Sequence, residues 1–124
     1  MKESGRVTEG TVDVTFFPPL TPLESDLTIY KKTVSALTAT DLDRLLQIRG
    51  ITTLVLTGLA TNWVVEGTAR EASDRGYRVI VLRDCCGAMT DEEQEHTLRF
   101  ILPLIATVTT ADEFIKWLEG RRTS

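Results

Sequence analysis

Apolar and β-branched residues gather in short runs that alternate with helical patterns from residue 27 onward. The strand-like runs cover residues 27–31, 53–57, 77–82 and 106–108. The segments between them place apolar residues at helical spacing. Such alternation is typical of a parallel sheet, because parallel strands are joined by helices that cover both faces. We therefore predict an α/β fold of three layers around a parallel sheet.

Capping patterns mark the ends of the helices. A threonine followed three residues later by an acidic residue, as in a capping box, occurs at three places: Thr40–Asp43, Thr90–Glu93 and Thr110–Glu113. Gly50 is suited to end the first of these helices. A further helix is predicted from about residue 62 to 74. The last helix carries an apolar side for docking on the sheet, formed by Phe114, Trp117 and Leu118.

The first 25 residues follow no such pattern. Glycines and prolines break any long periodicity there, at Gly5, Gly10, Pro18, Pro19 and Pro22. We interpret residues 1–25 as mostly loop, in which 12–16 forms either one short strand or a packed excursion. Residues 26–124 supply the α/β core, and the whole chain of 124 residues is expected to be a single domain.

Composition narrows the classes of partner. The chain is 42% hydrophobic and 26% charged, with a net charge of -4 and both signs interspersed. No basic stripe is available to follow a phosphate backbone, so nucleic acid is not expected as a partner. The apolar run at 53–59 is far shorter than the ~20 residues of a membrane helix, and no signal-peptide pattern opens the chain. These features predict a cytoplasmic protein without a membrane partner.

The residues that usually bind metals are few. Cys85 and Cys86 are adjacent, and neighbouring cysteines rarely satisfy disulfide geometry, so both are expected to be thiols. His96 is the single histidine of the chain and is expected to be exposed on a helix. Without a spaced cysteine and histidine cluster, neither a metal nor another cofactor is predicted.

Residues 54–72 read as a strand, a tight turn and a helix, with the sequence Leu-Val-Leu-Thr-Gly-Leu-Ala-Thr-Asn-Trp-Val-Val-Glu-Gly-Thr-Ala-Arg-Glu-Ala. This segment resembles the nucleophile turn of the isochorismatase-like cysteine hydrolases. The resemblance continues in family order through four other segments, 26–31, 40–42, 74–86 and 90–109. It implies an isochorismatase-like, Rossmann-like fold that is incomplete at its N-terminus, because no family first strand precedes Lys31.

The resemblance also implies a catalytic site. Members of the family use an aspartate, a lysine and a cysteine, and a helix N-terminus lowers the pKa of the thiol. Lys31 matches the lysine, although a solvated lysine at a strand end is the alternative interpretation. Val64 stands at the position of the cysteine and is chemically inert. Asp13 lacks the context of the family aspartate and is interpreted as a surface residue.

The resemblance also implies roles for backbone groups of the turn. The family turn implies a cis peptide bond between Leu59 and Ala60, and an oxyanion hole formed by the backbone N–H groups of Ala60 and Val64. Trp63 either lines the pocket or packs against a neighbouring subunit, and Cys86 is interpreted as buried packing. The pocket is expected to include Thr61, Asn62 and Trp63.

Three functional hypotheses follow from the resemblance. The first is a hydrolase that uses groups outside the cysteine triad. The second is a catalytically degenerate subunit that binds a small-molecule ligand or serves assembly. The third is a part of a longer hydrolase acting on an amide or an enol ether. Because the strand at 53–57 would have an unpaired apolar edge, we expect a homo-oligomer or pairing with another chain, unless the Lys31 strand moves across to fill the place.

Overall fold

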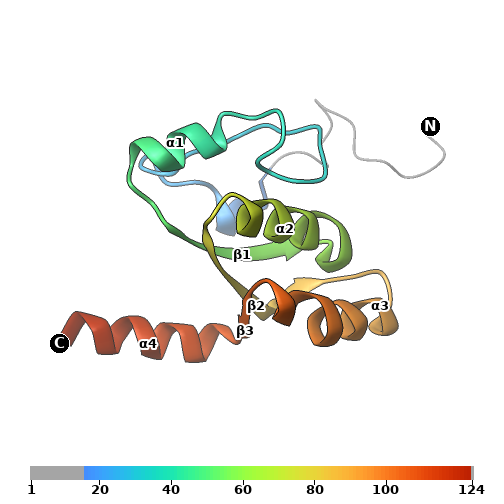
Figure 1. Ribbon diagram of the computed structural model, residues 1–124. Coiled ribbons are helices and arrows are strands. Elements are labelled where there is room, and N and C mark those ends of the chain that lie inside the picture. Colours follow the sequence, from blue (N-terminus) through green and yellow to red (C-terminus); the bar gives the residue numbers. More distant parts are fainter. Residues whose placement is uncertain (1–15, 124) are drawn as a thin grey trace.

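The computed structural model describes residues 16–123 and contains a parallel sheet with helices packed on it (Figure 1). Its helices and strands are α1 (Leu42–Ile48), β1 (Thr53–Leu59), α2 (Glu66–Asp74), β2 (Arg78–Gly87), α3 (Asp91–His96), β3 (Thr107–Thr109) and α4 (Ala111–Thr123). Short 3₁₀ segments lie at Pro18–Leu20 and Leu102–Leu104, and π-helical segments at Thr61–Val65 and Thr97–Ile101. The described strands follow the order β1-β2-β3, and both pairs are parallel. The predicted α/β fold with a parallel sheet is confirmed.

The centre of the sheet is β2, whose residues 79–82 are all buried. Val79 and Val81 belong to the main hydrophobic core, which α1, α2 and the segment after α3 complete through Leu46, Ala69, Ala72 and Leu102. Ile80 and Leu82 point to the opposite face by strand alternation and are 5% and 8% exposed. A strand that is apolar on both faces is what a covered parallel sheet requires.

Two glycines end helices, Gly50 as the sequence pattern predicts and Gly76 after α2. Gly50 has a φ of +67° and Gly76 a φ of +94°, in the left-handed region that residues with a Cβ rarely adopt. After α1, the N–H of Ile51 donates to the carbonyl of Leu46 at 3.0 Å. After α2, the N–H of Tyr77 donates to the carbonyl of Ala72, also at 3.0 Å. Both bonds are the long closing bond of a Schellman motif.

The three predicted capping boxes have different outcomes. Thr90 caps α3, since its side chain accepts from the N–H of Glu93 at 3.1 Å. Thr110 accepts from the N–H of Glu113 at 3.2 Å. The prediction at Thr40 is wrong, because Thr40 accepts from the N–H of Leu42 instead, at 3.3 Å. The carboxylate of Asp43 points away from that backbone and binds the side chains of Arg75 and Tyr77.

Two other expectations are wrong. The segment 27–31 is not a strand, because within the described part of the chain the sheet ends at β1 and offers this segment no strand partner. The apolar side of α4 does not dock along the sheet, since Trp117 and Leu118 are 42% and 40% exposed. Only the start of α4 is tied to β2, through the N–H of Ala111 and the carboxylate of Asp84 at 2.9 Å. The rest of α4 extends away from the sheet (Figure 1).

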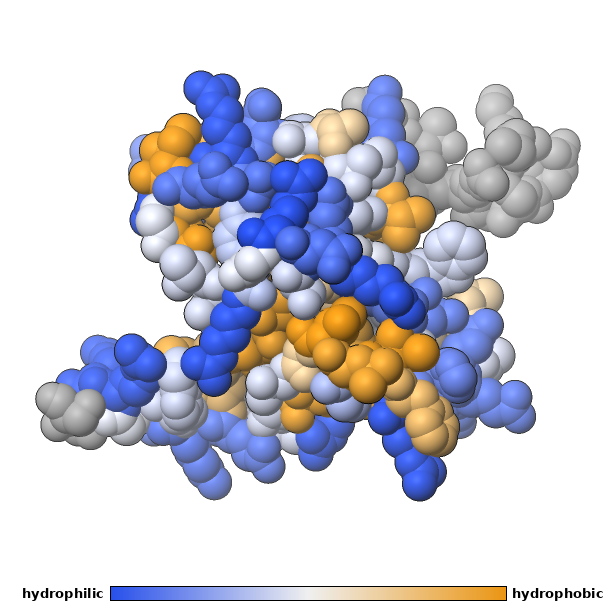
Figure 2. Space-filling view, in the orientation of Figure 1, coloured by the Kyte–Doolittle hydropathy of each residue, from blue (hydrophilic) through white to orange (hydrophobic). Residues whose placement is uncertain are grey.

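Hydrophobic side chains are exposed on the face drawn in Figure 2, where they gather in the lower half of the view. Figure 1 places α3 and the helical segments that follow it in this part of the molecule. Phe100 and Leu104 of these segments are 56% and 80% exposed.

Among residues 16–123 no helix is long and apolar enough to span a membrane. Asp13 lies outside the described residues. So do residues 12–15 of the short strand considered at 12–16, of which only Phe16 is described.

Candidate functional site at the end of β1

The turn that follows β1 has an unusual backbone. Gly58 has a φ of +125°, and the pairing with β2 shifts register between Leu56 and Gly58. The peptide bond between Leu59 and Ala60, one residue further on, is cis, at the position that the resemblance implies. In parallel sheets, ligands bind outside the carboxyl ends of the strands. The turn therefore lies where an α/β protein of this kind places its site.

A glutamine that the sequence analysis did not single out holds this turn in place. Thr61 is fully buried, and its hydroxyl donates to Oε1 of Gln94 at 2.5 Å. Nε2 of Gln94 donates in turn to the carbonyl of Cys86 at 3.0 Å. Gln94 thus connects the turn after β1 to the end of β2. No motif marks it in the sequence, because its role depends on α3 lying across both strand ends.

The helix after the turn begins with a π-helical segment. The carbonyl of Ala60 accepts from the N–H groups of Trp63 and Val65, both at 3.2 Å. Val65 is buried, Val64 is partly buried and Trp63 is 62% exposed. π-Helical turns are rare and occur often at functional sites. That the N–H groups of Ala60 and Val64 form an oxyanion hole stays a prediction.

Lys31 lies in an exposed loop. Its ammonium group donates to two carbonyls of its own segment, Thr33 at 2.5 Å and Val34 at 3.2 Å. The predicted strand that would end at Lys31 does not form, and the lysine folds back on its own backbone. Its role as the family lysine stays a prediction.

The loop after Lys31 is nevertheless anchored on α2. Ser35 and Thr38 donate to Oε1 of Glu71 at 2.5 and 2.7 Å, and the N–H of Ala36 donates to Thr68 at 3.0 Å. The hydrogen bond from Ser35, followed by those from Thr38 and Arg75, lowers the pKa of Glu71 below its ordinary value. These polar contacts connect the segment that carries Lys31 to α2, which follows the π-helical segment that carries Val64.

Close packing supports the same contact. Gly67 faces Val34, and a Cβ added at Gly67 would lie 2.9 Å from Cγ1 of Val34. That distance is shorter than real Cβ contacts allow, so the absence of a side chain at Gly67 lets the loop approach the first turns of α2. The sequence pattern does not mark Gly67, because a glycine inside a helix gives no indication of what approaches it.

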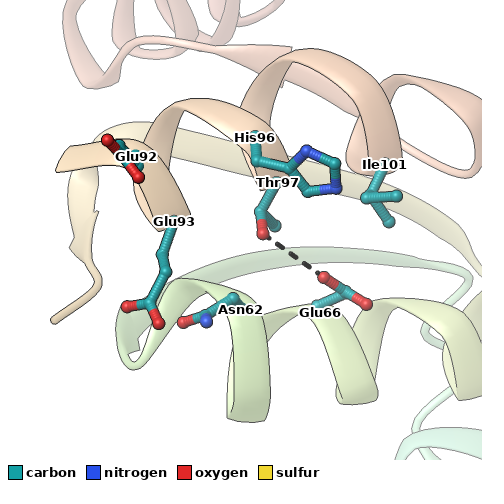
Figure 3. A pocket seen from close by; sticks show the side chains of 7 residues that line it. All are labelled: Asn62, Glu66, Glu92, Glu93, His96, Thr97 and Ile101. Atoms are coloured by element: carbon teal, nitrogen blue, oxygen red, sulfur yellow. Dashed lines mark hydrogen bonds between the residues drawn. The ribbon is translucent and has the colours of Figure 1, made fainter. Parts of the chain in front are cut away.

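A cleft of about 440 Å³ lies between the start of the helix that follows β1 and the helix α3 with the segment after it (Figure 3). Seven residues line it: Asn62, Glu66, Glu92, Glu93, His96, Thr97 and Ile101. Oδ1 of Asn62 is buried and has no hydrogen-bond partner among the described residues. In the view of Figure 3 the carboxylates of Glu66 and Glu93 lie on either side of Asn62. Thr97 donates to Glu66 at 3.4 Å.

The three predicted pocket residues therefore have different positions. Thr61 is buried and holds the turn, Asn62 lines the cleft, and Trp63 is exposed to solvent. His96, which was expected to be exposed, is exposed at the rim of the same cleft. No group of three histidine, cysteine or acidic side chains suited to a metal ion is found in the part of the chain that the structure describes.

Comparison with known proteins assigns the family. A family model described as the isochorismatase domain matches residues 2–113. The chain belongs to the isochorismatase family. The isochorismatase family protein YwoC of Bacillus subtilis (strain 168) is 46% identical over 101 residues, which are 82% of this chain and 53% of YwoC. An isochorismatase-like hydrolase from Alkaliphilus metalliredigens has a TM-score of 0.84 and 38% identity, over 88% of this chain and 59% of that chain.

Other family members are named as enzymes. Ureidoacrylate amidohydrolase RutB of Methylorubrum extorquens is 45% identical over 76 residues, which are 61% of this chain and 31% of RutB. Maleamate amidohydrolase of Pseudomonas putida is 30% identical over 110 residues, 89% of this chain and 52% of that enzyme. This chain spans about half the length of YwoC and of the Escherichia coli relative YecD.

The two thiols of this isochorismatase family chain lie at the end of β2 and not at the helix that follows β1. Cys86 is half-buried, and its Sγ donates to the carbonyl of Leu82 at 3.3 Å. Burial raises the pKa of Cys86, and desolvation together with neighbouring Asp84 raises the pKa of Cys85. The thiolate is the nucleophilic form, and a raised pKa favours the protonated thiol at neutral pH.

Proposed function

We propose that this chain is a catalytically degenerate member of the isochorismatase family that binds a small carbonyl compound at the turn after β1. The proposal rests on Val64, which the resemblance of residues 54–72 places at the position of the family's cysteine. A valine cannot ionise or form a thioester. The turn around it has the cis bond at Leu59–Ala60 that the resemblance implies, and the hydrogen bond from Thr61 to Gln94 holds this turn in place.

The chemistry of the thiols supports loss of cysteine catalysis. Cys85 and Cys86 both have a raised pKa and neither follows the helix-initiating turn. A thiol at the N-terminus of a helix gains from the partial positive charge there and from backbone N–H groups that hold an oxyanion. The end of β2 does not provide this combination, so we do not expect these cysteines to replace the nucleophile.

An assay of turnover and binding tests the proposal. The wild-type chain and Val64→Cys are incubated with maleamate, ureidoacrylate and isochorismate, and product formation is followed. We expect no turnover by either protein. Val64→Cys restores a thiol but not the aspartate base, which leaves a general-base contribution of roughly 10²- to 10⁴-fold missing. Alkylation with iodoacetamide across a pH series reports whether the new thiol is reactive.

Binding is measured separately, by thermal shift and calorimetry with the same compounds. A ligand that binds only the folded chain raises the melting temperature in proportion to the logarithm of its concentration. Val64→Phe fills the turn and is expected to abolish the shift, whereas Ile48→Phe, at a 68% exposed position on α1, should leave it unchanged. Any turnover by the wild type would contradict the degenerate assignment, and its sensitivity to alkylation would show whether Cys85 or Cys86 takes part. A lack of any ligand-induced shift would contradict the binding role.

A second candidate function is favoured by a different observation. The chain spans about half the length of YwoC and YecD, which supports a part of a longer hydrolase whose remaining groups come from another segment. Robust amide hydrolysis by Val64→Cys only after addition of the N-terminal half of a family member would favour this candidate over the first.

A further inference from the structure

The parallel pairing of β1 and β2 is interrupted just before the turn that follows β1. Leu56 pairs with Val81, and the next pair is Gly58 with Cys86. One residue separates these two pairs on β1, whereas residues 82–85 separate them on β2. Beyond this interruption the ladder contains only two pairs. Strand pairing alone therefore leaves the turn weakly positioned.

Gln94 of α3 connects the two strands across this interruption. Its Oε1 accepts a hydrogen bond from the hydroxyl of Thr61 at 2.5 Å, and its Nε2 donates to the carbonyl of Cys86 at 3.0 Å. An amide side chain has one acceptor end and one donor end, and both are used here, so its orientation is fixed. Thr61 is fully buried, which protects its hydrogen bond from water on that side. The residue that begins the helix after the turn is thus held at a set distance from the end of β2.

A second hydrogen bond keeps α3 itself in place. Thr97, in the π-helical segment after α3, donates to Oε1 of Glu66 at the start of α2, at 3.4 Å (Figure 3). Thr97 is 2% exposed, and Glu66 is also bound by Nε of Arg70 at 3.1 Å. Gln94 and Thr97 lie nearly one helical turn apart. Two neighbouring turns therefore bind the helix after β1, which prevents Gln94 from following the turn if the turn shifts.

The position of the turn matters because backbone N–H groups act through their direction. The first N–H groups of a helix have no partner within the helix and attract negatively charged oxygen or sulfur atoms. A site of this kind works only when its donors lie within about 0.5 Å of the required geometry. Val64 belongs to the same π-helical segment that Thr61 begins. Whatever fixes Thr61 therefore also fixes the N–H groups around Val64.

We propose that Gln94 is a positioning residue for the site at the turn after β1. By bridging Thr61 and the carbonyl of Cys86, it sets the direction of the backbone N–H groups of residues 60–64. The effect on a bound compound rests on the proposed function, whereas the effect on the turn itself is measurable without a ligand.

A thiol introduced by Val64→Cys reports the geometry of the turn. Cys85 and Cys86 are first replaced by serine, which keeps the backbone carbonyl that Gln94 binds. The rate of alkylation with iodoacetamide, measured across a pH series, gives the pKa of the single remaining thiol. We expect this pKa to lie below that of a free cysteine, about 8.5, because the groups at a helix N-terminus stabilise a thiolate. Gln94→Met should raise it toward the free value and slow alkylation at neutral pH about threefold or more.

Matched variants separate positioning from a general loss of stability. Thr61→Val should raise the pKa of the thiol as Gln94→Met does, and Thr61→Ser, which keeps the hydroxyl, should restore the parent value. Met89→Leu, at an 89% exposed position just before α3, is the control and should change nothing. A merely destabilised fold would have the opposite effect at neutral pH, because unfolding exposes the partly buried residue 64 and speeds its alkylation. Equal pKa values of the thiol in the parent and in Gln94→Met would overturn the proposal.

Ligand binding is measured by calorimetry on the wild-type chain and on Gln94→Met, with maleamate, ureidoacrylate and isochorismate. Gln94→Met should weaken binding about tenfold, and Met89→Leu should leave it unchanged. If no compound binds the wild type while the pKa of the thiol responds to Gln94→Met, the proposed function fails and the positioning role stands. Binding to Gln94→Met that is as tight as to the wild type would overturn the positioning role.

Discussion

Replacing Thr61 by valine removes one hydroxyl group from the best-buried part of the site. Valine has nearly the same shape as threonine, so the substitution leaves packing intact and deletes only the hydrogen bond to Oε1 of Gln94, which is 2.5 Å long. Thr61 is fully buried and no cavity is created. Any loss of stability therefore reports the connection between the turn after β1 and α3.

The magnitude follows from the partners that remain. A net hydrogen bond contributes about 0.5 to 1.5 kcal/mol, and a buried acceptor left without a donor costs about 1 to 3 kcal/mol. Gln94 is only partly buried, so water replaces some of the lost interaction. We expect Thr61→Val to lower the free energy of unfolding by about 1 to 2 kcal/mol, which is roughly 4 to 8 °C in melting temperature for a chain of this length.

The assay is urea and thermal unfolding followed by circular dichroism. Thr61→Ser keeps a hydroxyl group and should recover part of the loss. Gln94→Met keeps the size of the side chain and removes both its hydrogen bonds, including that to the carbonyl of Cys86. In the double variant with Thr61→Val, the two losses should fall short of additivity by about 1 kcal/mol. Unchanged unfolding of Thr61→Val, or strict additivity, would refute the role assigned to Gln94.

Two other substitutions test the contact between the Lys31 loop and α2. Gly67→Ala should lower the free energy of unfolding by about 1 to 2 kcal/mol, because the added Cβ would lie 2.9 Å from Cγ1 of Val34. Gly120→Ala is the control. It has open space around it and should be neutral or stabilising by up to ~1 kcal/mol. Glu71→Gln should cost about 1 kcal/mol in urea unfolding at neutral pH and little at about pH 3. The reason is that the pKa of Glu71 is lower in the folded chain than its ordinary value of 4.5. The ionised carboxylate therefore stabilises the fold at any pH above 4.5, and this contribution is lost as the pH falls through the lowered pKa.

One result would contradict each of these two predictions. Equal stability of Gly67→Ala and the wild type would show that the loop can move away from α2 without cost. A difference between Glu71→Gln and the wild type that is as large in acid as at neutral pH would show that the carboxylate stabilises the fold by its shape and not by its charge.

Local patterns were sufficient to predict features that depend on neighbouring residues. The apolar run at residues 77–82 was enough to predict a strand, and the structure buries its residues 79–82 on both faces. Thr90 and Gly50 mark helix ends because a capping hydroxyl and a left-handed φ act within a few residues. The ordered motifs at 54–72 likewise placed the turn after β1, since a strand, a glycine and a helix follow each other directly.

Only the tertiary structure decided features that need a distant partner. Whether residues 27–31 form a strand depends on a neighbouring strand to accept their hydrogen bonds, and whether α4 docks depends on how far the sheet extends beneath it; sequence patterns contain neither fact. Gln94 and Gly67 became visible only when α3 and the Lys31 loop were placed against the turn and α2. Short-range periodicity therefore predicted most of the helices and strands but not the fate of residues 27–31. Contacts between residues more than thirty positions apart determined which elements meet at the site, because hydrogen bonds and close packing act between surfaces that the chain brings together only on folding.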